Sequence, residues 1–188
     1  MPNLYIIAGC NGAGKTTASY TILPEMLECK EFVNADEIAR GISPFQPESV
    51  SIEAGRIMLK RIKDLIQKQV DFAFETTLSN RSYRPLIIDA QKKGYSVTLI
   101  FFWLNSVDLA LERVKKRVLS GGHNVPQETI IRRYKTGVDN MSRIYLSICD
   151  YWMIFDNSEP PTSLIAEGLK KGNCTIYNHQ FYNQIIKP

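Results

Sequence analysis

The feature that most constrains this chain is a glycine-rich loop close to its N-terminus. The loop Gly9-Cys10-Asn11-Gly12-Ala13-Gly14-Lys15-Thr16 follows a short apolar run, Leu4-Tyr5-Ile6-Ile7-Ala8, and precedes a helix-compatible stretch. Glycine adopts backbone angles that are closed to other residues, so successive N–H groups of such a loop can point inward together. The positive end of the following helix dipole points at the same place. The spacing GxxxxGK[ST], between a buried strand and a helix, therefore predicts a triphosphate-binding loop.

Each position of this loop has an expected role. Lys15 can reach the β- and γ-phosphates, which makes it an expected catalytic residue, and the Thr16 hydroxyl can ligate Mg²⁺. ATP and Mg²⁺ are therefore the expected cofactors. The predicted ATP-binding residues are Gly9, Cys10, Asn11, Gly12, Ala13, Gly14, Lys15, Thr16 and Thr17.

Apolar runs alternate with helical patterns along the rest of the chain. Further strands are predicted at 31–34, 71–74, 96–104 and 151–155, and the last part of the chain is expected to add a short β-pair and a helix. This alternation predicts an α/β fold, with a parallel sheet and helices on both of its faces. The length of 188 residues suits one domain, 1–188. In the helix expected from a cap at Ser49 to about Gln69, helical spacing predicts a buried face formed by Ile52, Leu59, Ile62 and Ile66.

Composition excludes several classes of protein. The net charge of +4 is mild and the basic residues form no long run, so we expect no nucleic-acid partner. The four cysteines form no CxxC pair, which argues against structural zinc and disulfides. We expect no signal peptide, and the longest apolar run, Leu99 to Leu104, is too short for a membrane span. The expectation is a soluble, cytoplasmic protein with no membrane partner.

Two carboxylates follow predicted strands. Asp36 lies in Asn34-Ala35-Asp36 after the second strand, and Glu75 lies in Glu75-Thr76-Thr77 after the third. Ligands of open α/β sheets bind beyond the carboxyl ends of the strands, so both carboxylates should reach the loop. We expect Asp36 to be a general base and Glu75 to hold metal-bound water or a substrate hydroxyl. The alternative is that Asp36 caps the helix that starts near Glu37.

The segment from 113 to 133 is rich in basic residues. Two helices joined by Gly121-Gly122-His123 form a predicted hairpin with arginines at its rim, as in a lid that closes over phosphates. Helical angles place Arg117 and Arg133 beside the apolar stripes and Arg132 away from them. The alternative is a solvated charged face, and His123 could bond phosphate or only shape the turn. The candidate lid residues are Arg113, Arg117, His123, Arg132 and Arg133.

These motifs occur together in one known family. They are Gly9-x-Asn11-Gly12-Ala13-Gly14-Lys15-Thr16-Thr17, Asn34-Ala35-Asp36, Phe74-Glu75-Thr76-Thr77-Leu78 and Gly121-Gly122-His123-x-Val125-Pro126. The set resembles the zeta toxin family of P-loop kinases, in particular its chromosomal members. The resemblance spans about Leu4 to Asn157, and its last three motifs are far more specific than the glycine loop.

The resemblance implies an adenylate-kinase-like fold with a helical lid. It also implies ATP-dependent phosphorylation of a sugar hydroxyl on a UDP-amino sugar such as UDP-N-acetylglucosamine. Asp36 would be the general base, Glu75 and Thr77 would help hold the substrate, and Arg117 would stabilise the transferring phosphoryl group. Arg40 completes the expected substrate-binding residues.

The hairpin loop departs from the family pattern. Plasmid members carry a second catalytic arginine where this chain has His123, and Arg132 or Arg133 is the alternative source of that charge. Plasmid members are also held inactive by a small helical antitoxin. An antitoxin is therefore a candidate partner beside the sugar-nucleotide substrate, although no residue pattern here shows one.

Other functions stay open. The acceptor could be another small molecule, a nucleoside or a polynucleotide end, or the chain could be a non-catalytic switch that binds ATP to dock a protein. Leu119-Ser120-Gly121-Gly122-His123 resembles the signature of ABC ATPases, but Asn157 follows Asp156 where that class needs a glutamate. No guanine-binding Asn-Lys-x-Asp signature occurs, which disfavours a GTPase.

Overall fold

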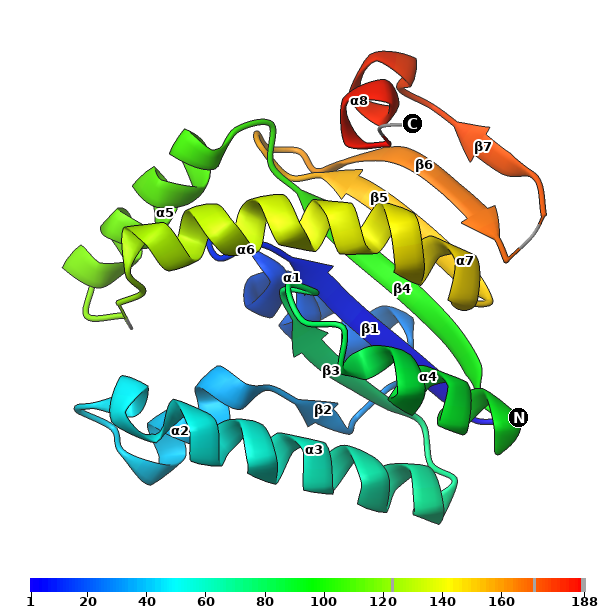
Figure 1. Ribbon diagram of the computed structural model, residues 1–188, viewed down its shortest axis with the longest axis horizontal. Coiled ribbons are helices and arrows are strands. Elements are labelled where there is room, and N and C mark those ends of the chain that lie inside the picture. The colour runs from blue at the N-terminus through cyan, green and yellow to red at the C-terminus, as the bar shows by residue number, and fades with distance from the viewer. Residues whose placement is uncertain (123, 171, 187–188) are drawn as a thin grey trace.

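The computed structural model describes residues 1–122, 124–170 and 172–186, which form one seven-stranded sheet with helices around it (Figure 1). Across the sheet the strands lie in the order β2-β3-β1-β4-β5-β6-β7. The parallel strands are β1 (Asn3–Gly9), β2 (Phe32–Val33), β3 (Phe72–Thr76), β4 (Ser96–Trp103) and β5 (Tyr151–Asp156), and the antiparallel ones are β6 (Ser163–Leu169) and β7 (Cys174–Ile176).

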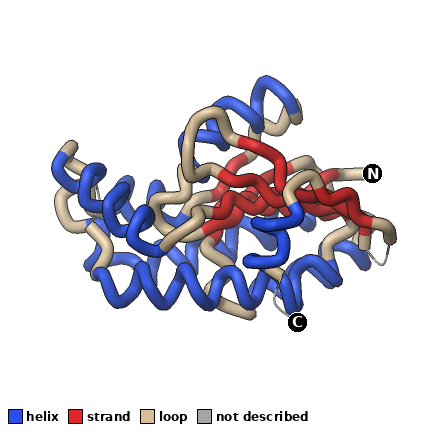
Figure 2. The backbone as a smooth tube through the Cα atoms, turned by 90° about the horizontal axis from the view of Figure 1, so that it is seen from above, coloured by secondary structure: helices blue, strands red, loops and turns tan. Residues whose placement is uncertain are grey.

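Helices cover both faces of the sheet, which is seen edge-on between them in Figure 2. The α-helices are α1 (Lys15–Thr21), α2 (Ala35–Ile42), α3 (Ser51–Lys68), α4 (Tyr83–Lys92), α5 (Val107–Leu119), α6 (Gln127–Asn140), α7 (Leu146–Ile148) and α8 (His179–Ile185). Three short helical turns also occur among the described residues: η1 (Ile22–Met26) and η3 (Met141–Tyr145) are π-helical, and η2 (Pro47–Val50) is a 3₁₀ turn.

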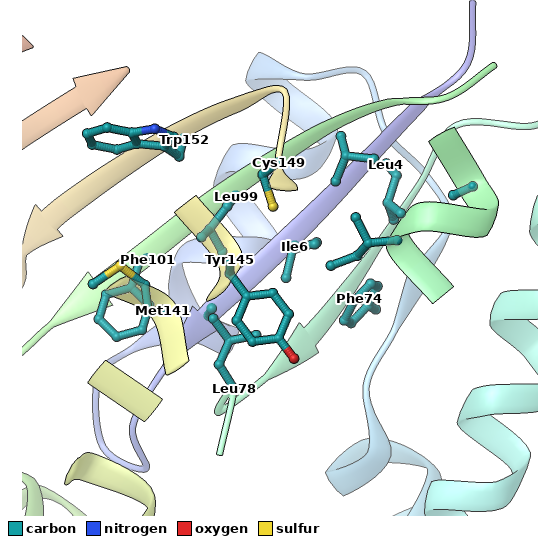
Figure 3. Close-up of a cluster of buried hydrophobic side chains, with 14 of the residues drawn as sticks. Leu4, Ile6, Phe74, Leu78, Leu99, Phe101, Met141, Tyr145, Cys149 and Trp152 are labelled. Atoms are coloured by element: carbon teal, nitrogen blue, oxygen red, sulfur yellow. The ribbon is translucent and has the colours of Figure 1, made fainter. Parts of the chain in front are cut away.

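The alternation of side chains along β1 separates two hydrophobic cores. Leu4 and Ile6 belong to the larger core, which packs against α3, α4, η3 and α8, and Figure 3 shows its centre around Tyr145. Ile7 faces the opposite side and packs with side chains from η1 and α5. Burial of a large aliphatic side chain contributes about 1.5–3 kcal/mol, so both cores fix the strands firmly. The predicted α/β fold with helices on both faces is confirmed.

The position of β1 determines where a ligand can bind. The chain passes from β1 to β2 and β3 on one side of it and then crosses to β4 on the other side. Ligands of open α/β sheets bind beyond the strand ends at such a reversal. The glycine loop follows β1 there, while Asn34 follows β2 and Glu75 lies near the end of β3.

One sequence-based detail is wrong. Ile52 is 74% exposed, and Ser49 does not cap α3, because its hydroxyl donates to the carbonyl of Gln46 within the preceding turn. Ile62 and Ile66 are buried as predicted and Leu59 is half-buried, whereas Ile52 lies in the first turn of α3 and is exposed to solvent. The buried face of α3 consists of Ala54, Met58, Ile62, Leu65 and Ile66. By contrast, the cap at Ser106 is present, with its hydroxyl accepting from the Leu109 N–H.

In the part of the chain that the structure describes, no helix has the length and apolar content needed to cross a bilayer.

Candidate active site

The glycine loop has the backbone geometry that its sequence predicts. Gly12 and Gly14 have φ angles of +83° and +80°, in the left-handed region that favours glycine. Gly9 has a φ of +145°, and a Cβ there would lie 2.3 Å from the carbonyl oxygen of Phe102. A Cβ at Gly14 would lie 2.5 Å from Nδ2 of Asn157. The loop therefore fits only with glycine at these positions.

Asn157, which follows β5, holds this loop in place through hydrogen bonds. Its Nδ2 donates to the carbonyl of Ala13 at 2.8 Å, and its own N–H donates to the carbonyl of Trp103 at 3.0 Å. The hydroxyl of Thr162 donates to the Asn157 Oδ1 at 2.5 Å. The segment after β5 thus fixes the loop against the sheet, which is a role that the sequence did not reveal.

Glu75 joins the loop to the neighbouring strands. Its Oε2 accepts from the Thr16 hydroxyl at 2.7 Å and from Asn34 Nδ2 at 2.9 Å, while Lys15 Nζ lies 3.5 Å from Oε1. The Lys15 and Glu75 side chains are only 7% and 9% exposed, and Lys15 Nζ also donates to the carbonyl of Cys10 at 2.9 Å. A buried carboxylate needs such partners, since burial of an unpaired charge is costly.

The oxygens at this place suit a magnesium ion. Mg²⁺ binds through hydroxyl, carboxylate and phosphate oxygens and usually keeps several waters. The Thr16 hydroxyl and the Glu75 carboxylate supply two such donors side by side. Among the described residues no cluster of three or more histidine, cysteine or acidic side chains offers a cage made by protein alone. The donors therefore fit an ion that is held partly by substrate phosphates.

Asn34, and not Asp36, is the cap of α2. The Asn34 Oδ1 accepts from the N–H groups of Asp36 at 2.8 Å and Glu37 at 3.4 Å. The capping alternative for Asp36 is therefore wrong, because the role is taken two residues earlier. The Asp36 side chain lies in the first turn, is exposed, and lines the same cavities as Lys15. Its assignment as a base remains a prediction.

Arg113 and Arg133 have different partners although both belong to the predicted lid. Arg113 donates from Nη1 to the carbonyl of Asn157 at 2.8 Å and from Nη2 to that of Ser158 at 2.7 Å. Arg133 donates from Nη1 to Oδ1 of Asn11, in the glycine loop, at 3.2 Å. Burial lowers the pKa of Arg133, and the nearby Asp36 carboxylate opposes that shift.

The remaining lid residues are placed in part. Arg117 is half-buried and lines the cavity over the glycine loop, and Arg132 is exposed, as the helical angles predicted. His123 lies outside the described residues. The second helix of the hairpin, α6, packs closely against the segment after β3. A Cβ at Gly137 would lie 2.5 Å from the carbonyl oxygen of Thr77, so only glycine allows this approach.

Three adjoining compartments make up the candidate site. The loop compartment, of about 340 Å³, is lined by Arg40, Arg113 and Arg117 and by the residues Asn11, Gly12 and Gly14 to Thr17, but not by Gly9, Cys10 or Ala13. The middle compartment, of about 150 Å³, shares Asp36 and Glu75 with it. The outer compartment has a volume of about 690 Å³. The middle and outer compartments share Thr76, Thr77, Tyr83 and Arg133 in their walls.

Most of the expected ATP- and substrate-binding residues therefore line adjoining compartments. Cys10 lines a separate small pocket behind the loop, and burial raises the pKa of its thiol to about 11, which keeps it neutral at physiological pH. Arg81 and Tyr83, which belong to none of the sequence motifs, line the outer compartment. The sequence around these two residues carries no signal for this role, because the compartment forms only when α6, a distant segment of the chain, packs opposite them.

Comparison with known proteins places the chain in a family. The zeta toxin family model matches residues 1–166. An uncharacterized protein of Haemophilus influenzae is 32% identical over 126 residues, which are 67% of this chain and 88% of that protein.

Two solved structures share the fold. A chain in the complex of AvrRxo1-ORF1 with AvrRxo1-ORF2 and sulphate ions has a TM-score of 0.79 at 17% identity, with 100% of this chain and 64% of that chain covered. A chain of the PezAT chromosomal toxin–antitoxin system of Streptococcus pneumoniae has a TM-score of 0.70 at 17% identity, with 99% and 77% covered. Together with the matched family model and the phosphate-binding loop, these findings show that the chain belongs to the zeta toxin family and is an ATP-dependent kinase.

Proposed function

We propose that this kinase transfers the γ-phosphoryl group of ATP to a sugar hydroxyl of a UDP-N-acetylamino sugar. The observation that carries the proposal is the middle compartment, where the exposed carboxylate of Asp36 lies in one wall with Lys15, Glu75 and Arg133. A kinase needs these groups together: a base for the acceptor, a cation for the phosphates, and a cation for charge that develops during transfer.

The roles follow from the contacts. The loop N–H groups and Lys15 hold the β- and γ-phosphates of ATP, and Asp36 orients the acceptor hydroxyl and takes its proton. Arg133, held by Asn11, lies between the loop and the acceptor side, and Arg117 lies over the loop. Both offset negative charge on the transferring group. Thr16 and Glu75 would hold Mg²⁺, which would neutralise phosphate charge when bound.

The choice of acceptor rests on the resemblance of the four motifs to the zeta toxins. Thr77, Glu75 and Arg40 would bind the acceptor: Thr77 and Glu75 line the middle compartment, and Arg40 lines the loop compartment. The four cysteines are free, and Cys10, Cys29 and Cys149 are buried, so we propose that the reaction takes place in the reducing cytoplasm.

The test is ADP production with ATP, Mg²⁺ and a panel of sugar nucleotides, nucleosides and antibiotics, with products identified by mass. Phosphorylation of UDP-N-acetylglucosamine would support the proposal, while turnover with only a nucleoside or an antibiotic would replace the acceptor. ATP binding without turnover on any acceptor would favour the switch. Asp36→Asn should bind ATP as the wild type does and lose transfer, and normal turnover by this variant would remove Asp36 as the base.

A protein partner belongs to the same proposal. The PezAT structure is described as a toxin–antitoxin system, and we propose that an antitoxin controls this chain. Growth of bacteria that express the wild type or Asp36→Asn tests the premise that activity is toxic. Growth arrest by the wild type alone supports it, whereas equal growth of both strains at matched expression contradicts it.

A further inference from the structure

The turn that follows β3, residues 77–81, contains an unfavourable backbone conformation, and we call it the β3 turn. Leu78 has a φ of +53°, in the left-handed region that favours glycine and is uncommon for a bulky residue. Its side chain is fully buried in the larger core. A residue other than glycine keeps such an angle only where the surrounding structure enforces it. The β3 turn therefore depends on its contacts with other segments.

The end of α6 supplies several of these contacts. Asn140 is only 3% exposed, and its Nδ2 donates to the carbonyl of Leu78 at 2.8 Å. Its Oδ1 accepts from Nε of Arg81, at the other end of the turn, at 3.3 Å. One helical turn earlier, Gly137 brings α6 against the carbonyl of Thr77. The buried amide of Asn140 thus connects two points of the β3 turn to the helix.

A further contact comes from the π-helical segment η3. Its hydrogen bonds join residues five apart, which lets Tyr145 reach the same turn as Asn140 does. Tyr145 is fully buried in the core shown in Figure 3, and its hydroxyl donates to the carbonyl of Asn80 at 2.8 Å. Burial raises the pKa of Tyr145 to about 12, so the hydroxyl stays a donor at physiological pH. Two buried side chains after Gly137 therefore hold successive parts of the β3 turn.

The same side of α6 also contacts the glycine loop. Arg133, Gly137 and Asn140 are spaced by four and three residues, which places them on one side of a helix. Arg133 donates to Oδ1 of Asn11 in the loop at 3.2 Å. The helix therefore contacts the phosphate-binding loop at Arg133 and the β3 turn at its end. A helix is a rigid element, so it sets the distance between the two.

We infer that Asn140 and Tyr145 are positioning residues of the kinase reaction, which hold the β3 turn and its Thr77 at a fixed place relative to the glycine loop. Thr77 lines the middle and outer compartments, and its hydroxyl is hydrogen-bonded to that of Ser79 at 2.9 Å. This role rests on the proposed function, in which Thr77 contacts the acceptor. Asn140 and Tyr145 do not line the middle compartment, where Asp36 lies, so they act through the turn.

Two tyrosines provide a matched comparison. Tyr145→Phe removes only the hydroxyl that donates to the β3 turn. Tyr95→Phe removes a hydroxyl that donates to the carbonyls of Leu65 and Val70 at 3.0 and 2.9 Å, near the amino end of β4 and away from the site. Both tyrosines are buried, and each variant leaves a buried carbonyl without its donor, so both should lose stability. Only Tyr145→Phe should impair use of the acceptor.

Kinetics with ATP, Mg²⁺ and UDP-N-acetylglucosamine separate positioning from stability. We expect Tyr145→Phe to lower kcat/KM for the acceptor about 10-fold or more, because misplacement by about 1 Å can lower a rate about 10²-fold. KM for ATP should not change, since the glycine loop keeps its own contacts. Tyr95→Phe should have wild-type kinetics. Wild-type kcat/KM for the acceptor in Tyr145→Phe, or an equal loss in both variants, would overturn the inference.

Asn140→Asp separates the two contacts of the amide. The carboxylate still accepts from Arg81 but cannot donate to the carbonyl of Leu78. We expect kcat/KM for the acceptor to fall at least as far as in Tyr145→Phe, again with KM for ATP unchanged. Wild-type acceptor kinetics in Asn140→Asp would contradict the inference. Circular dichroism and thermal melting establish that each variant is folded, and the tyrosine pair decides the question if Asn140→Asp is not.

Hydrogen exchange, followed by mass spectrometry, tests the same anchoring without turnover. Residues 77–82 should exchange about 5-fold faster or more in Tyr145→Phe and Asn140→Asp than in the wild type, because a lost hydrogen bond favours local opening. Tyr95→Phe should match the wild type over these residues. Unchanged exchange in both turn variants would overturn the inference, whichever acceptor is used.

The two measurements distinguish a failed reaction from a failed anchor. If the wild type phosphorylates a different acceptor of the panel, the kinetic comparison uses that acceptor. If it phosphorylates none, the proposed function fails, while faster exchange confined to the two turn variants still supports α6 as the element that fixes the β3 turn.

Discussion

The floor and the roof of the candidate site are built in different ways. The floor is the loop 9–16, where Gly9 and Gly14 leave no room for a Cβ and the buried Lys15 is held by a loop carbonyl and Glu75. The roof is the α5–α6 hairpin, whose arginines are half-buried or exposed and whose position depends on contacts with distant segments. The residue types of the floor form one motif of eight consecutive residues, whereas the roof arginines come from two helices and depend on tertiary packing for their partners.

This difference explains what the roof arginines do. Arg113 and Arg133 look alike in the sequence, since each is an arginine on a helix of the predicted lid. In the structure Arg113 binds two backbone carbonyls after β5, whereas Arg133 binds an amide of the loop and lines the reaction space. A helical angle predicts the direction of a side chain but not its partner. The chemistry of the floor is therefore predictable from a motif, and that of the roof is not.

The largest expected effect comes from the floor. Lys15→Ala should reduce turnover by at least about 10³-fold and weaken ATP binding, because it removes the cation of the loop and leaves the Glu75 carboxylate with fewer partners. ADP production and ATP titration measure the two effects. Lys63→Ala, an exposed lysine on α3, is the control that should change neither. A Lys15→Ala variant with wild-type kinase activity would refute the account of the loop.

A second substitution tests the steric basis of the floor. Gly9→Ala should lower the free energy of unfolding by about 3 kcal/mol or more, because its Cβ would meet a backbone carbonyl that cannot easily move. Gly55 lies inside α3, and a Cβ added there would meet no atom within 4 Å, so Gly55→Ala should stabilise by about 0.5–1 kcal/mol. Urea denaturation measures both values. Similar stabilities of the two variants would show that the loop is not fixed by its glycines.

The third prediction separates the two roof arginines. Arg133→Gln should lower kcat by about 10²–10³-fold with little loss of stability, as expected for a group that acts on developing charge. Arg113→Gln should instead lower stability by about 1–3 kcal/mol, because the carbonyls of Asn157 and Ser158 lose their donors. Kinetics and urea denaturation of both variants give the answer. If Arg113→Gln is as stable as the wild type but loses kcat, Arg113 is a catalytic arginine and the two residues share one role.

The features that the sequence predicts depend on local patterns, and those that it does not predict depend on tertiary packing. The loop, the alternation of strands and helices and the carboxylates at strand ends depend on local patterns and on the general rule for ligands of open sheets. The outer compartment could not be predicted, because Arg81 and Arg132 come from segments about fifty residues apart and meet only through packing. The close approach of Gly137 to Thr77, which positions α6, has no local signal either.

The role of Asn34 is only partly predictable from the sequence, and its substitution has the smallest expected effect. Its residue type before a helix is a recognisable cap signal, but its second contact, from Nδ2 to Glu75, is visible only in the structure. Asn34→Asp keeps an oxygen for the cap and replaces the donor with a carboxylate that repels Glu75, so kcat should fall about 10-fold while the cap is retained. Asn34→Ala should lose the cap as well, at a cost of about 1 kcal/mol in stability.

Comparison of the two Asn34 variants separates the contributions of its contacts. Kinetics and urea denaturation should show Asn34→Asp to be the more stable protein, with impaired catalysis and retained ATP binding. An Asn34→Asp variant with wild-type kcat would mean that the contact with Glu75 has no catalytic consequence. Asn34 would then support the site only by capping the helix that carries Asp36.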